Sequence, residues 1–564
     1  MTKLEKLQKT TSLSKFAKLL NYQPKTISYI LYKIPEEDKY NQFEIFKKNG
    51  EKRKIQAPIK KLKLLQRRLA NLLNECFDEI CNKNKKTKSL SHGFRKKHSI
   101  ITNAKKHKNR RYVFNVDLQN FFPSINFGRV IGFFIKNNHF SLKPEVATVI
   151  AQIACHDNAL PQGSPCSPII SNLIGHLLDI RMVNLAKKTK CTYSRYADDL
   201  TFSTNKKEFP EKIAIKKNES DWVAGRALTK EIEKMGFSVN AKKTSMQYRT
   251  SRQMATGLIV NKKINVKKEY YKKARAMCHN LFKSDNFYID KNSEKEGTLK
   301  QLEGIISFIY QVKSPHYIEN KKPTAITALY RKFLFYKHFF SIDKPLIVCE
   351  GKTDIIYLKC ALKQLENEYK ELMGKSDKGI NFKIKFLNIS KNFKEVLNVA
   401  EGTTGLLSLI NMYKDGFKHF KGKGKKYPVI IVLDNDKATG KIKSRIQEQL
   451  KLNNDKTADK KKQKQKLDTN KYYHFAHNLH IMFAIKEDGK EIEDLFDKEV
   501  LDTNVEGKKF SRKDKIDTKQ EYSKTIFAEK VIKANQTKIN FEGFKPVFNK
   551  VKNIIKEYSK KNSQ

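Results

Sequence analysis

The spacing of apolar residues changes several times along the chain, and each change predicts a different element. In residues 1–42 apolar positions recur every three or four residues, which predicts a small helical lead-in. Short alternating runs over 43–55, around a turn at Asn49-Gly50, predict a β-hairpin. A basic amphipathic helix is expected over about residues 61–81.

The next part of the chain alternates strand-like and helix-like patterns. The apolar run RRYVFNVDL at 110–118 predicts a strand, and the Pro/Gly-rich start of 161–180 predicts a loop that leads into a helix. The segment CTYSRYADDLTFST at 191–204 predicts a pair of strands. Helical segments are expected from about 267 to 312.

A new pattern begins after a mixed connector at 316–343. The segments KPLIVCEGKTD (344–354) and YPVIIVLDNDKATG (427–440) each join an apolar strand to an acidic, Gly-containing turn. Strands that alternate with helices are typical of α/β domains, so we predict one over 344–500. Residues 501–564 are expected to form a basic C-terminal extension.

The composition of the chain predicts the number of domains, a class of binding partner and a cellular compartment. A chain of 564 residues predicts two or three domains, because single cores stop growing at roughly 250–300 residues. The 115 Lys and Arg against 59 Asp and Glu leave a net charge of +56, which favours nucleic acid as a partner, although a generally lysine-rich composition explains part of it. Eight scattered cysteines predict neither disulfides nor a zinc site, and no stretch matches the roughly 20 apolar residues of a membrane span. We therefore expect a cytoplasmic protein with no membrane partner.

Three aspartates form a first candidate metal site. Asp117 ends the predicted strand VFNVD, and Asp198 and Asp199 stand in YADD, where a hairpin turn would expose them. Nucleotide transfer to a growing strand uses two Mg²⁺ ions, and Mg²⁺ prefers carboxylate ligands. An isolated Asp-Asp pair is usually only a solvated turn, so the surrounding motifs decide its meaning.

The ordered series DLQNFF, LPQGSPCSP and YADDL resembles the palm motifs of reverse transcriptases. The resemblance implies a right-hand polymerase of fingers, palm and thumb over 43–315, with the three aspartates as catalytic metal ligands for two Mg²⁺ ions; Mn²⁺ is an alternative. It also implies that Phe122 excludes a ribose 2′-hydroxyl, unless this ring is only a core aromatic. Gln162 and Gly163 would line the incoming deoxynucleoside triphosphate. Arg53 in KNGEKRKIQAP would hold the triphosphate, with Lys52 and Lys54 as alternatives.

Two further elements are similar to those of bacterial retron reverse transcriptases. NAxxH is present at Asn103, Ala104 and His107, and the usual Val-Thr-Gly element appears as Ala-Thr-Gly with Thr256 and Gly257. The family copies part of a cognate noncoding RNA, whose branching guanosine supplies the primer 2′-hydroxyl, into branched RNA-linked DNA. These elements would contact that RNA.

The predicted thumb segment KKEYYKKARAMCHNLFK interleaves basic residues with Tyr270 and Tyr271. This composition suits contact with phosphates and stacking on RNA bases. A helix that packs its aromatic residues inward would show the same composition.

The C-terminal acidic motifs resemble those of Toprim domains, the metal-binding fold of topoisomerases, bacterial primases and several nucleases. The resemblance implies Glu350 as general acid or base and metal ligand, and Asp434 and Asp436 as further ligands, for one or two Mg²⁺ ions. Asp354 would support the first turn. Glu493 in KEIEDLFD would be another ligand, or belong to an ordinary charged helix start.

The fusion of a retron polymerase to a Toprim domain is a known arrangement, and it implies an antiphage system whose Toprim part is a nuclease effector controlled by the RNA–DNA product. The target of that nuclease, the phage trigger and homo-oligomerisation are left open. The alternatives are a group II intron-like or other mobile-element polymerase, a primase or topoisomerase half, and a Toprim half that only binds nucleic acid.

Overall fold

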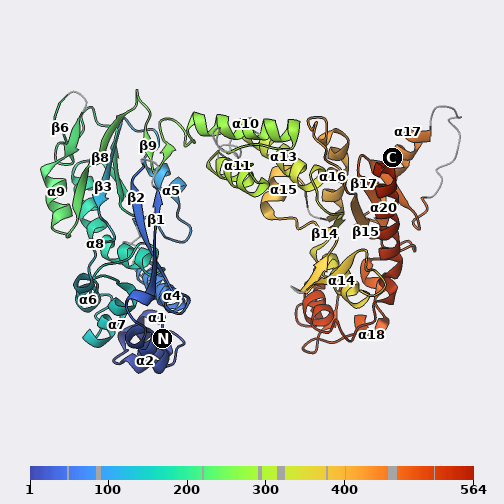
Figure 1. Cartoon of the computed structure of the whole chain (residues 1–564), viewed down its shortest axis with the longest axis horizontal. Coiled ribbons are helices and arrows are strands. Elements are labelled where there is room, and N and C mark those ends of the chain that lie inside the picture. Colours follow the sequence, from blue (N-terminus) through green and yellow to red (C-terminus); the bar gives the residue numbers. More distant parts are fainter. Residues whose placement is uncertain are drawn as a thin grey trace. The chain divides into compact units, whose positions relative to one another are not determined.

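The chain forms two compact units, Met1–Lys268 and Glu269–Gln564. Both units are shown in Figure 1. The computed structural model describes residues 1–46, 50–83, 90–218, 221–289, 295–313, 324–376, 379–400, 402–454, 467–513 and 515–563.

The helical lead-in predicted for the N-terminus is present. It consists of α1 (Lys3–Gln8), α2 (Leu13–Leu19) and α3 (Pro24–Ser28), followed by the short helices η1 (Tyr29–Lys33) and η2 (Glu37–Lys39). Thr2 and Ser12 cap α1 and α2 through their side-chain oxygens. The apolar faces of these helices are buried in one core with the long helix α4 (Lys60–Lys83).

The predicted hairpin is also present. Strand β1 (Tyr40–Phe46) pairs in antiparallel register with β2 (Lys52–Pro58). Gly50 lies in the connection with φ of +84°, a conformation that glycine adopts without steric cost. Asn49, the other residue of the predicted turn, lies outside the described residues.

An antiparallel sheet of four strands forms the centre of unit 1. Its order is β4-β5-β3-β8, with β3 (Tyr112–Gln119) and β5 (Asp199–Thr204) in the middle and β4 (Thr192–Tyr196) and β8 (Ser238–Tyr248) at the edges. The remaining elements of this unit are α5 (Ile100–Lys106), α6 (Phe127–Lys136), α7 (Pro144–Ala154), α8 (Ser167–Lys188), α9 (Arg226–Glu233), β6 (Ala214–Lys216), β7 (Trp222–Ala224), β9 (Met254–Ala255) and β10 (Leu258–Ile259). Among the described helices only α8 is long and apolar enough to cross a membrane, and 67% of its apolar window is buried, as expected of a core helix.

Unit 2 begins with three helices that pack together. They are α10 (Lys268–Ser284), α11 (Leu299–Lys313) and α13 (Ala325–Phe335), and α13 continues into η3 (Tyr336–Phe340). The predicted thumb segment therefore belongs to the same compact unit as the described part of the predicted connector.

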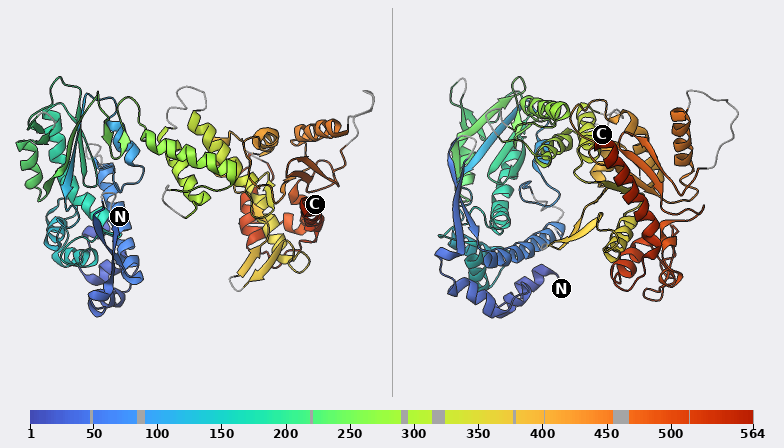
Figure 2. Two further views of the ribbon diagram at one scale, coloured as in Figure 1. Left: turned by 45° about the horizontal axis from the view of Figure 1, so that its top comes forward. Right: turned by 45° about the vertical axis from the view of Figure 1, so that its right-hand side comes forward.

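A five-stranded sheet forms the core of unit 2, seen from two sides in Figure 2. Its order is β14-β11-β15-β17-β16, and only the pair β16–β17 is antiparallel. The strands are β14 (Lys385–Phe386), β11 (Leu346–Cys349), β15 (Val429–Leu433), β17 (Leu479–Phe483) and β16 (Tyr472–Ala476). Accompanying elements are α14 (Lys352–Gln364), β12 (Met373–Ser376), β13 (Gly379–Phe382), α15 (Lys391–Leu397), α16 (Gly402–Gly416) and α17 (Gly440–Asn454). The predicted alternation of strands and helices is thus observed.

The C-terminal residues are part of this same domain and do not form a separate extension. Their elements are η4 (Ile492–Leu495), α18 (Lys498–Leu501), β18 (Lys509–Phe510), β19 (Glu521–Tyr522), α19 (Lys524–Ile526), η5 (Phe527–Lys533), η6 (Glu542–Phe544) and α20 (Lys545–Ser563). Phe527, Val547 and Ile554 are buried in one core with Ile347 of β11 and Met482 of β17. The basic residues of this segment lie mainly on its exposed face. Its apolar residues are part of the core.

Candidate functional site

The sheet of unit 1 brings the three predicted catalytic aspartates together. Asp117 on β3 lies directly opposite Asp199 on β5 in the antiparallel register. The turn between β4 and β5 carries Asp198, whose carbonyl accepts a hydrogen bond of 3.0 Å from the amide of Leu118. The YADD turn thus sits beside the end of β3, as the sequence predicted.

The electrostatics of these aspartates are those of crowded like charges. Desolvation by the surrounding protein, together with the charges of Asp198 and Asp117, raises the pKa of Asp199 to about 7 against the opposing charge of Lys243. The pKa of Asp198 is also raised, first by desolvation and then by Asp117, while Lys243 and Arg53 lower it. A site of this kind favours an added cation.

Two partners of Asp117 were not anticipated from the sequence. Asn240 donates a hydrogen bond of 2.9 Å to one carboxylate oxygen, and the Lys243 ammonium lies 3.2 Å from the other. Both residues stand on β8, the strand next to β3. The polar run NAKKT is visible in the sequence as a group of possible polar partners. Its closeness to Asp117 depends on the order of the strands in the sheet, which the sequence does not show.

The aspartates fit a divalent cation by the chemistry of their donors. They offer hard carboxylate oxygens from neighbouring strands, and an ammonium group already lies against one of them. Among the described residues, no three His, Cys, Asp or Glu side chains already converge as a complete metal-ligand set.

The loop that carries Gln162 and Gly163 is joined to the fingers hairpin. The carbonyl of Gln162 accepts a hydrogen bond of 2.8 Å from the amide of Gln56 on β2. Gly163 has φ of +125°, and a Cβ on it would lie 2.6 Å from the carbonyl oxygen of Gln56. Only glycine allows this approach of the loop to the hairpin, and the predicted contact of Gln162 and Gly163 with a nucleotide stays a prediction.

The predicted nucleotide-binding side chains are accessible. Arg53 is exposed on β2 and its charge acts on Asp198. Lys52 pairs with Glu44 at 2.8 Å across the hairpin. Phe122 is half-buried beside Phe121 and Phe94, with ring centroids 5.6 and 6.3 Å away. Part of the Phe122 ring packs on the core, and part remains available to a ligand.

A buried ion pair supports the YADD turn, and the sequence analysis missed it. Arg195 and Asp179 are both fully buried and form two hydrogen bonds of 2.8 Å. The third arm of the guanidinium donates to the carbonyl of Ala197 at 3.0 Å. Ala197 has φ of +56°, an uncommon conformation for a residue with a side chain. The guanidinium therefore holds the turn that presents Asp198 and Asp199.

The predicted RNA contacts of NAxxH need correction. Asn103 and His107 are fully buried. The two ring nitrogens of His107 bond to the hydroxyls of Ser203 (2.8 Å) and Ser194 (2.7 Å), and Ser194 donates to Asn103 at 2.7 Å. In this arrangement the side chains attach α5 to strands β4 and β5 and are out of reach of an RNA.

The other predicted RNA-binding residues are accessible. Thr256 and Gly257 form the turn between β9 and β10, with φ of +47° and +80°, and nothing lies near a Cβ built on Gly257. On α10, Tyr270 is 38% exposed and packs edge-on against Phe308, while the ammonium of Lys313 covers the ring of Tyr271. An RNA-binding role for these four residues stays a prediction.

Unit 2 holds a second acidic cluster, formed by Glu350, Asp354, Asp434, Asp436 and Glu493. Glu350 directly follows β11 and Asp434 directly follows β15, and these strands are parallel neighbours. The carboxyl ends of parallel strands lie at one edge of a sheet, so the two acidic turns meet there. Burial, together with the charges of Asp354, Glu493 and Glu350, raises the pKa of Asp434 to about 8.

One carboxylate oxygen of Glu350 accepts hydrogen bonds, and the other has no hydrogen-bond partner. The amide of Thr403 donates to Oε1 at 3.0 Å, and the Thr403 hydroxyl donates to it as well. Oε2 is buried without a hydrogen-bond partner. Desolvation raises the pKa of Glu350, as do Asp436 and Asp354. A buried, unpaired acceptor among like charges is suited to bind a cation or a proton.

Glu493 is already neutralised by the protein. Its carboxylate is fully buried, lies 3.2 Å from the Lys524 ammonium, and accepts a hydrogen bond of 3.3 Å from Tyr357. Metal ligation by Glu493 would therefore require Lys524 to move. Asp354 caps α14 by accepting from the amide of Gly351 at 2.8 Å, which is the supporting role expected of it. Asp436 accepts from the amide of Thr439 at 3.1 Å.

Comparisons with known proteins agree with the site in unit 1. The family model described as "Reverse transcriptase (RNA-dependent DNA polymerase)" matches residues 45–281. An RNA-directed DNA polymerase is thus the class defined by this palm and its aspartates. The match extends into α10, a helix of unit 2.

Similar proteins of known class identify a narrower family among the reverse transcriptases. Retron Ec86 reverse transcriptase of Escherichia coli is 31% identical over 325 residues, which cover 57% of this chain and 90% of that protein. Retron Mx65 reverse transcriptase of Myxococcus xanthus is 31% identical over 286 residues, covering 48% of this chain and 60% of that protein. The chain belongs to the retron reverse transcriptase family.

Among solved structures, telomerase from Candida albicans with a fragment of telomeric RNA aligns with 11% identity and a TM-score of 0.30, over 68% of this chain and 66% of that chain. A similarity of this size carries no argument about function.

Proposed function

We propose that this protein copies part of a cognate noncoding RNA into branched, RNA-linked single-stranded DNA, using a 2′-hydroxyl of that RNA as primer and deoxynucleoside triphosphates as substrates. The juxtaposition of Asp117, Asp198 and Asp199 in a chain of the retron family carries the proposal. A mobile-element polymerase is the alternative, and the NAxxH element favours the retron function.

The residues of the site have separate parts in this reaction. Divalent ions, when bound, would activate the attacking hydroxyl and hold the phosphates. Asp117, Asp198 and Asp199 would supply their carboxylate ligands, Arg53 would bind the triphosphate, and Phe122 would face the sugar. The Lys243 ammonium, 3.2 Å from Asp117, holds that carboxylate in place.

The gene expressed with its flanking DNA tests this proposal. Total nucleic acid is run on a denaturing gel with and without RNase, for the wild type and for Asp198→Asn/Asp199→Asn. A short, abundant DNA should shift after RNase and be missing from the double variant. Asp38→Asn/Asp221→Asn is the matched control, because both residues are exposed, and it should keep the DNA. Synthesis preserved in the first double variant would remove the palm assignment.

We also propose that unit 2 contains a Toprim-like domain that cleaves phosphodiesters with one or two Mg²⁺ or Mn²⁺ ions, as the effector of a cytoplasmic antiphage system. The free buried oxygen of Glu350 and the raised pKa of Asp434 support it, because clustered carboxylates repel one another without a cation. Glu350 and Asp434 would bind the ion, and Glu350 could exchange a proton with the reacting group. A domain that only binds nucleic acid has no need of this cluster.

Glu350→Gln separates the two activities. This variant should make the branched DNA at the wild-type level and lose protection against phage, together with Mg²⁺-dependent cleavage of DNA, tRNA or other RNA by the purified chain. The exposed residue Glu499, changed to Gln, is the control and should keep both activities. If Glu350→Gln protects cells fully, the effector function lies elsewhere in the chain.

A further inference from the structure

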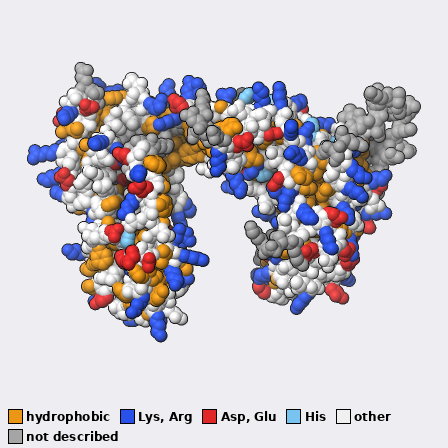
Figure 3. Space-filling view, viewed as in Figure 1, with side chains coloured by type: hydrophobic (Ala, Val, Ile, Leu, Met, Phe, Trp, Pro, Cys, Tyr) orange, Lys and Arg blue, Asp and Glu red, His pale blue; other side chains and the backbone are white. Residues whose placement is uncertain are grey.

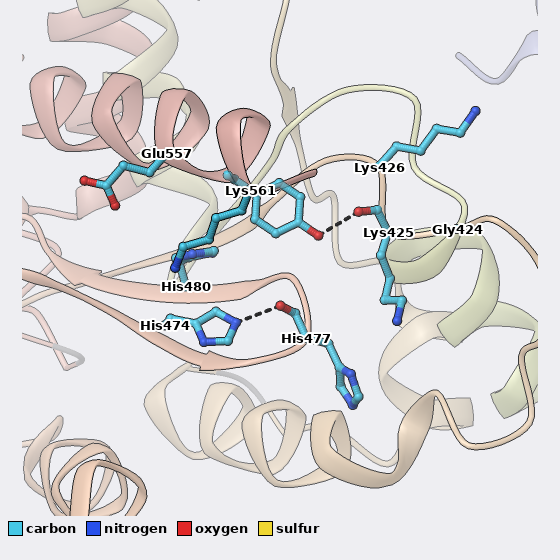
Figure 4. Close-up of a pocket in the computed structure, with 9 residues that line it drawn as sticks. Gly424, Lys425, Lys426, His474, His477, His480, Glu557 and Lys561 are labelled. Carbon is cyan, nitrogen blue, oxygen red and sulfur yellow. Dashed lines mark hydrogen bonds between the residues drawn. The ribbon is translucent and has the colours of Figure 1, made fainter. Parts of the chain in front are cut away.

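A pocket of about 540 Å³ opens in unit 2, and none of the five residues of the second acidic cluster lines it. Its wall is formed by the segment 424–426, the β16–β17 hairpin and the end of α20, as Figure 4 shows. Six of its lining residues are basic or imidazole side chains: Lys425, Lys426, Lys561, His474, His477 and His480.

The lysine-bearing segment is held in a defined position. The amide of Lys425 donates to the carbonyl of Phe340 at 2.7 Å, and the Tyr558 hydroxyl donates to the carbonyl of Lys425 at 2.6 Å. A Cβ on Gly424 would lie 2.3 Å from the Phe340 ring, so this position needs glycine. The backbone is fixed by contacts on one side, while the lysine side chains extend from it (Figure 4).

The pocket carries an excess of positive charge. Three lysines and one glutamate line it, so its lining side chains other than histidine carry a net charge of +2. Glu557 accepts a hydrogen bond from the Tyr472 hydroxyl. In the described part of the chain, Lys425, Lys426 and Lys561 form no ion pair with a carboxylate. This charge is therefore available to an anionic ligand.

Aromatic rings form another part of the wall. The rings of His474 and His480 are 5.1 Å apart at 56°, and Tyr558 meets His480 edge-on at 5.7 Å. Burial lowers the pKa of His480 to about 4, so its ring is neutral near pH 7. Figure 4 shows Lys561 reaching past His480 beside these rings. Flat rings beside ammonium groups suit a ligand with an aromatic base and a phosphate.

We propose that this pocket binds a phosphorylated nucleoside, with its phosphates on Lys425, Lys426 and Lys561 and its base against His474 and His480. The volume is in the range of pockets for ligands of this size, roughly 300–1,000 Å³. A free nucleotide and the 5′-terminal nucleotide of a strand share this chemistry. The site is separate from the palm and from the second acidic cluster.

Binding by the full-length chain tests the proposal. Radiolabelled ATP, a 5′-phosphorylated octanucleotide and its 5′-hydroxyl form are each titrated in EDTA, which removes the divalent ions that the two carboxylate sites would use. The variant Lys425→Ala/Lys426→Ala/Lys561→Ala is compared with Lys498→Ala/Lys538→Ala/Lys556→Ala, which removes the same charge from exposed positions outside the pocket. Thermal unfolding checks that both variants are folded.

The expected result is binding at least about tenfold weaker in the pocket variant and within about twofold of wild type in the control, because only the pocket variant loses charge-assisted contacts with the phosphates. Lysine-dependent binding of ATP identifies a free nucleotide, and lysine-dependent preference for the 5′-phosphorylated octanucleotide identifies a strand end. Equal affinities of the two triple variants for every nucleotide ligand overturn the proposal. So does lysine-dependent binding of a hexaglutamate peptide without binding of either nucleotide ligand.

The double variant His474→Ala/His480→Ala distinguishes the contribution of the base to binding from that of the phosphates. Binding of ATP should weaken in this variant while that of inorganic tripolyphosphate is retained. Equal retention of both would overturn the placement of the base. Because no polymerase or nuclease activity is measured, these results stand apart from the tests of the proposed function.

Discussion

At the scale of single residues, the polymerase site depends on side chains that never reach a substrate. Arg195 connects the buried carboxylate of Asp179 to the carbonyl of Ala197 in the YADD turn. Removing one partner of a buried ion pair leaves the other charge uncompensated, which costs about 3–5 kcal/mol.

Arg195→Met is therefore expected to lower the free energy of unfolding by about 3–5 kcal/mol and to reduce DNA synthesis, as measured by urea unfolding and primer extension. Arg181→Met is the control. Arg181 forms an exposed ion pair with Glu231 at 2.8 Å, and the loss of such a pair costs less than about 1 kcal/mol. Similar losses in both variants would contradict the role assigned to Arg195.

Gly163→Ala should impair DNA synthesis far more than stability alone explains. The added Cβ would lie 2.6 Å from the Gln56 carbonyl, so the hairpin that carries Arg53 must shift. Gly507→Ala is the control, because Gly507 has φ of +77° and open space around it. Primer extension at saturating template should show much lower activity for Gly163→Ala than for Gly507→Ala. Equal activity of the two variants would argue against a functional role for the contact between Gly163 and Gln56.

His107 predicts a pH dependence of stability. Burial lowers its pKa to about 3, from 6.5 when unfolded. Below pH 6.5 the unfolded chain binds a proton that the folded chain does not, so this group destabilises the fold progressively as the pH falls from 6.5 toward 3.

The variant His107→Gln should lose that contribution, which reaches at most about 1.4 kcal/mol per pH unit. Urea unfolding at pH 7 and pH 5 measures the difference, with the exposed His139→Gln as control. An unchanged difference between the two pH values in His107→Gln would mean that the ring is not buried as a neutral group.

At the scale of elements, α10 is attached to the α/β domain by aromatic packing. Phe420 contacts Phe282 of α10 and Tyr336 and Phe340 of η3, with ring centroids 5.0–5.2 Å apart. Asp285 adds a hydrogen bond of 2.7 Å from the Tyr336 hydroxyl. The helix that ends the reverse transcriptase match is thereby part of the unit that holds the second acidic cluster.

Phe420→Ala should loosen this attachment, because truncation of a buried phenylalanine costs about 3–5 kcal/mol. Limited proteolysis should then cut between α10 and the α/β domain at protease concentrations that leave the wild type intact. Tyr270→Ala, at an exposed ring of the same helix, should not change the cleavage pattern. Equal resistance of Phe420→Ala would show that the packing is not what holds α10.

At the scale of the whole molecule, the main feature is the excess of positive charge. Figure 3 shows Lys and Arg side chains spread over the visible faces of both units, in keeping with the net charge of +56. Binding to RNA should therefore release many counterions.

The affinity for the cognate RNA is expected to fall about 10³- to 10⁵-fold between 50 and 200 mM salt, if roughly six to ten phosphates are contacted. Filter binding over this range measures the slope. Asp198→Asn/Asp199→Asn should show the same slope, because the role proposed for these carboxylates is to hold metal ions, and carboxylates do not attract RNA phosphates. A slope near zero would mean that the excess charge is not used for RNA.

Sequence alone predicted the strands that precede the two carboxylate sets and the positions of those carboxylates at strand ends and turns. The apolar run before Asp117 and the runs before Glu350 and Asp434 predict buried strands locally, and an acidic residue at a strand end needs no tertiary information to be recognised. The hairpin at β1–β2 and the helical lead-in follow from the same local periodicity.

Only the tertiary structure decided which side chains meet. Lys243 reaches Asp117 because β8 lies beside β3, Arg195 of β4 is paired with Asp179 of α8, and Lys524 neutralises Glu493 from 31 residues further along the chain. Burial of His107 and packing of the C-terminal helix α20 into the core likewise depend on contacts between distant segments. The periodicity of apolar residues indicates which face of an element is apolar. The packing of the whole chain determines which other element covers that face.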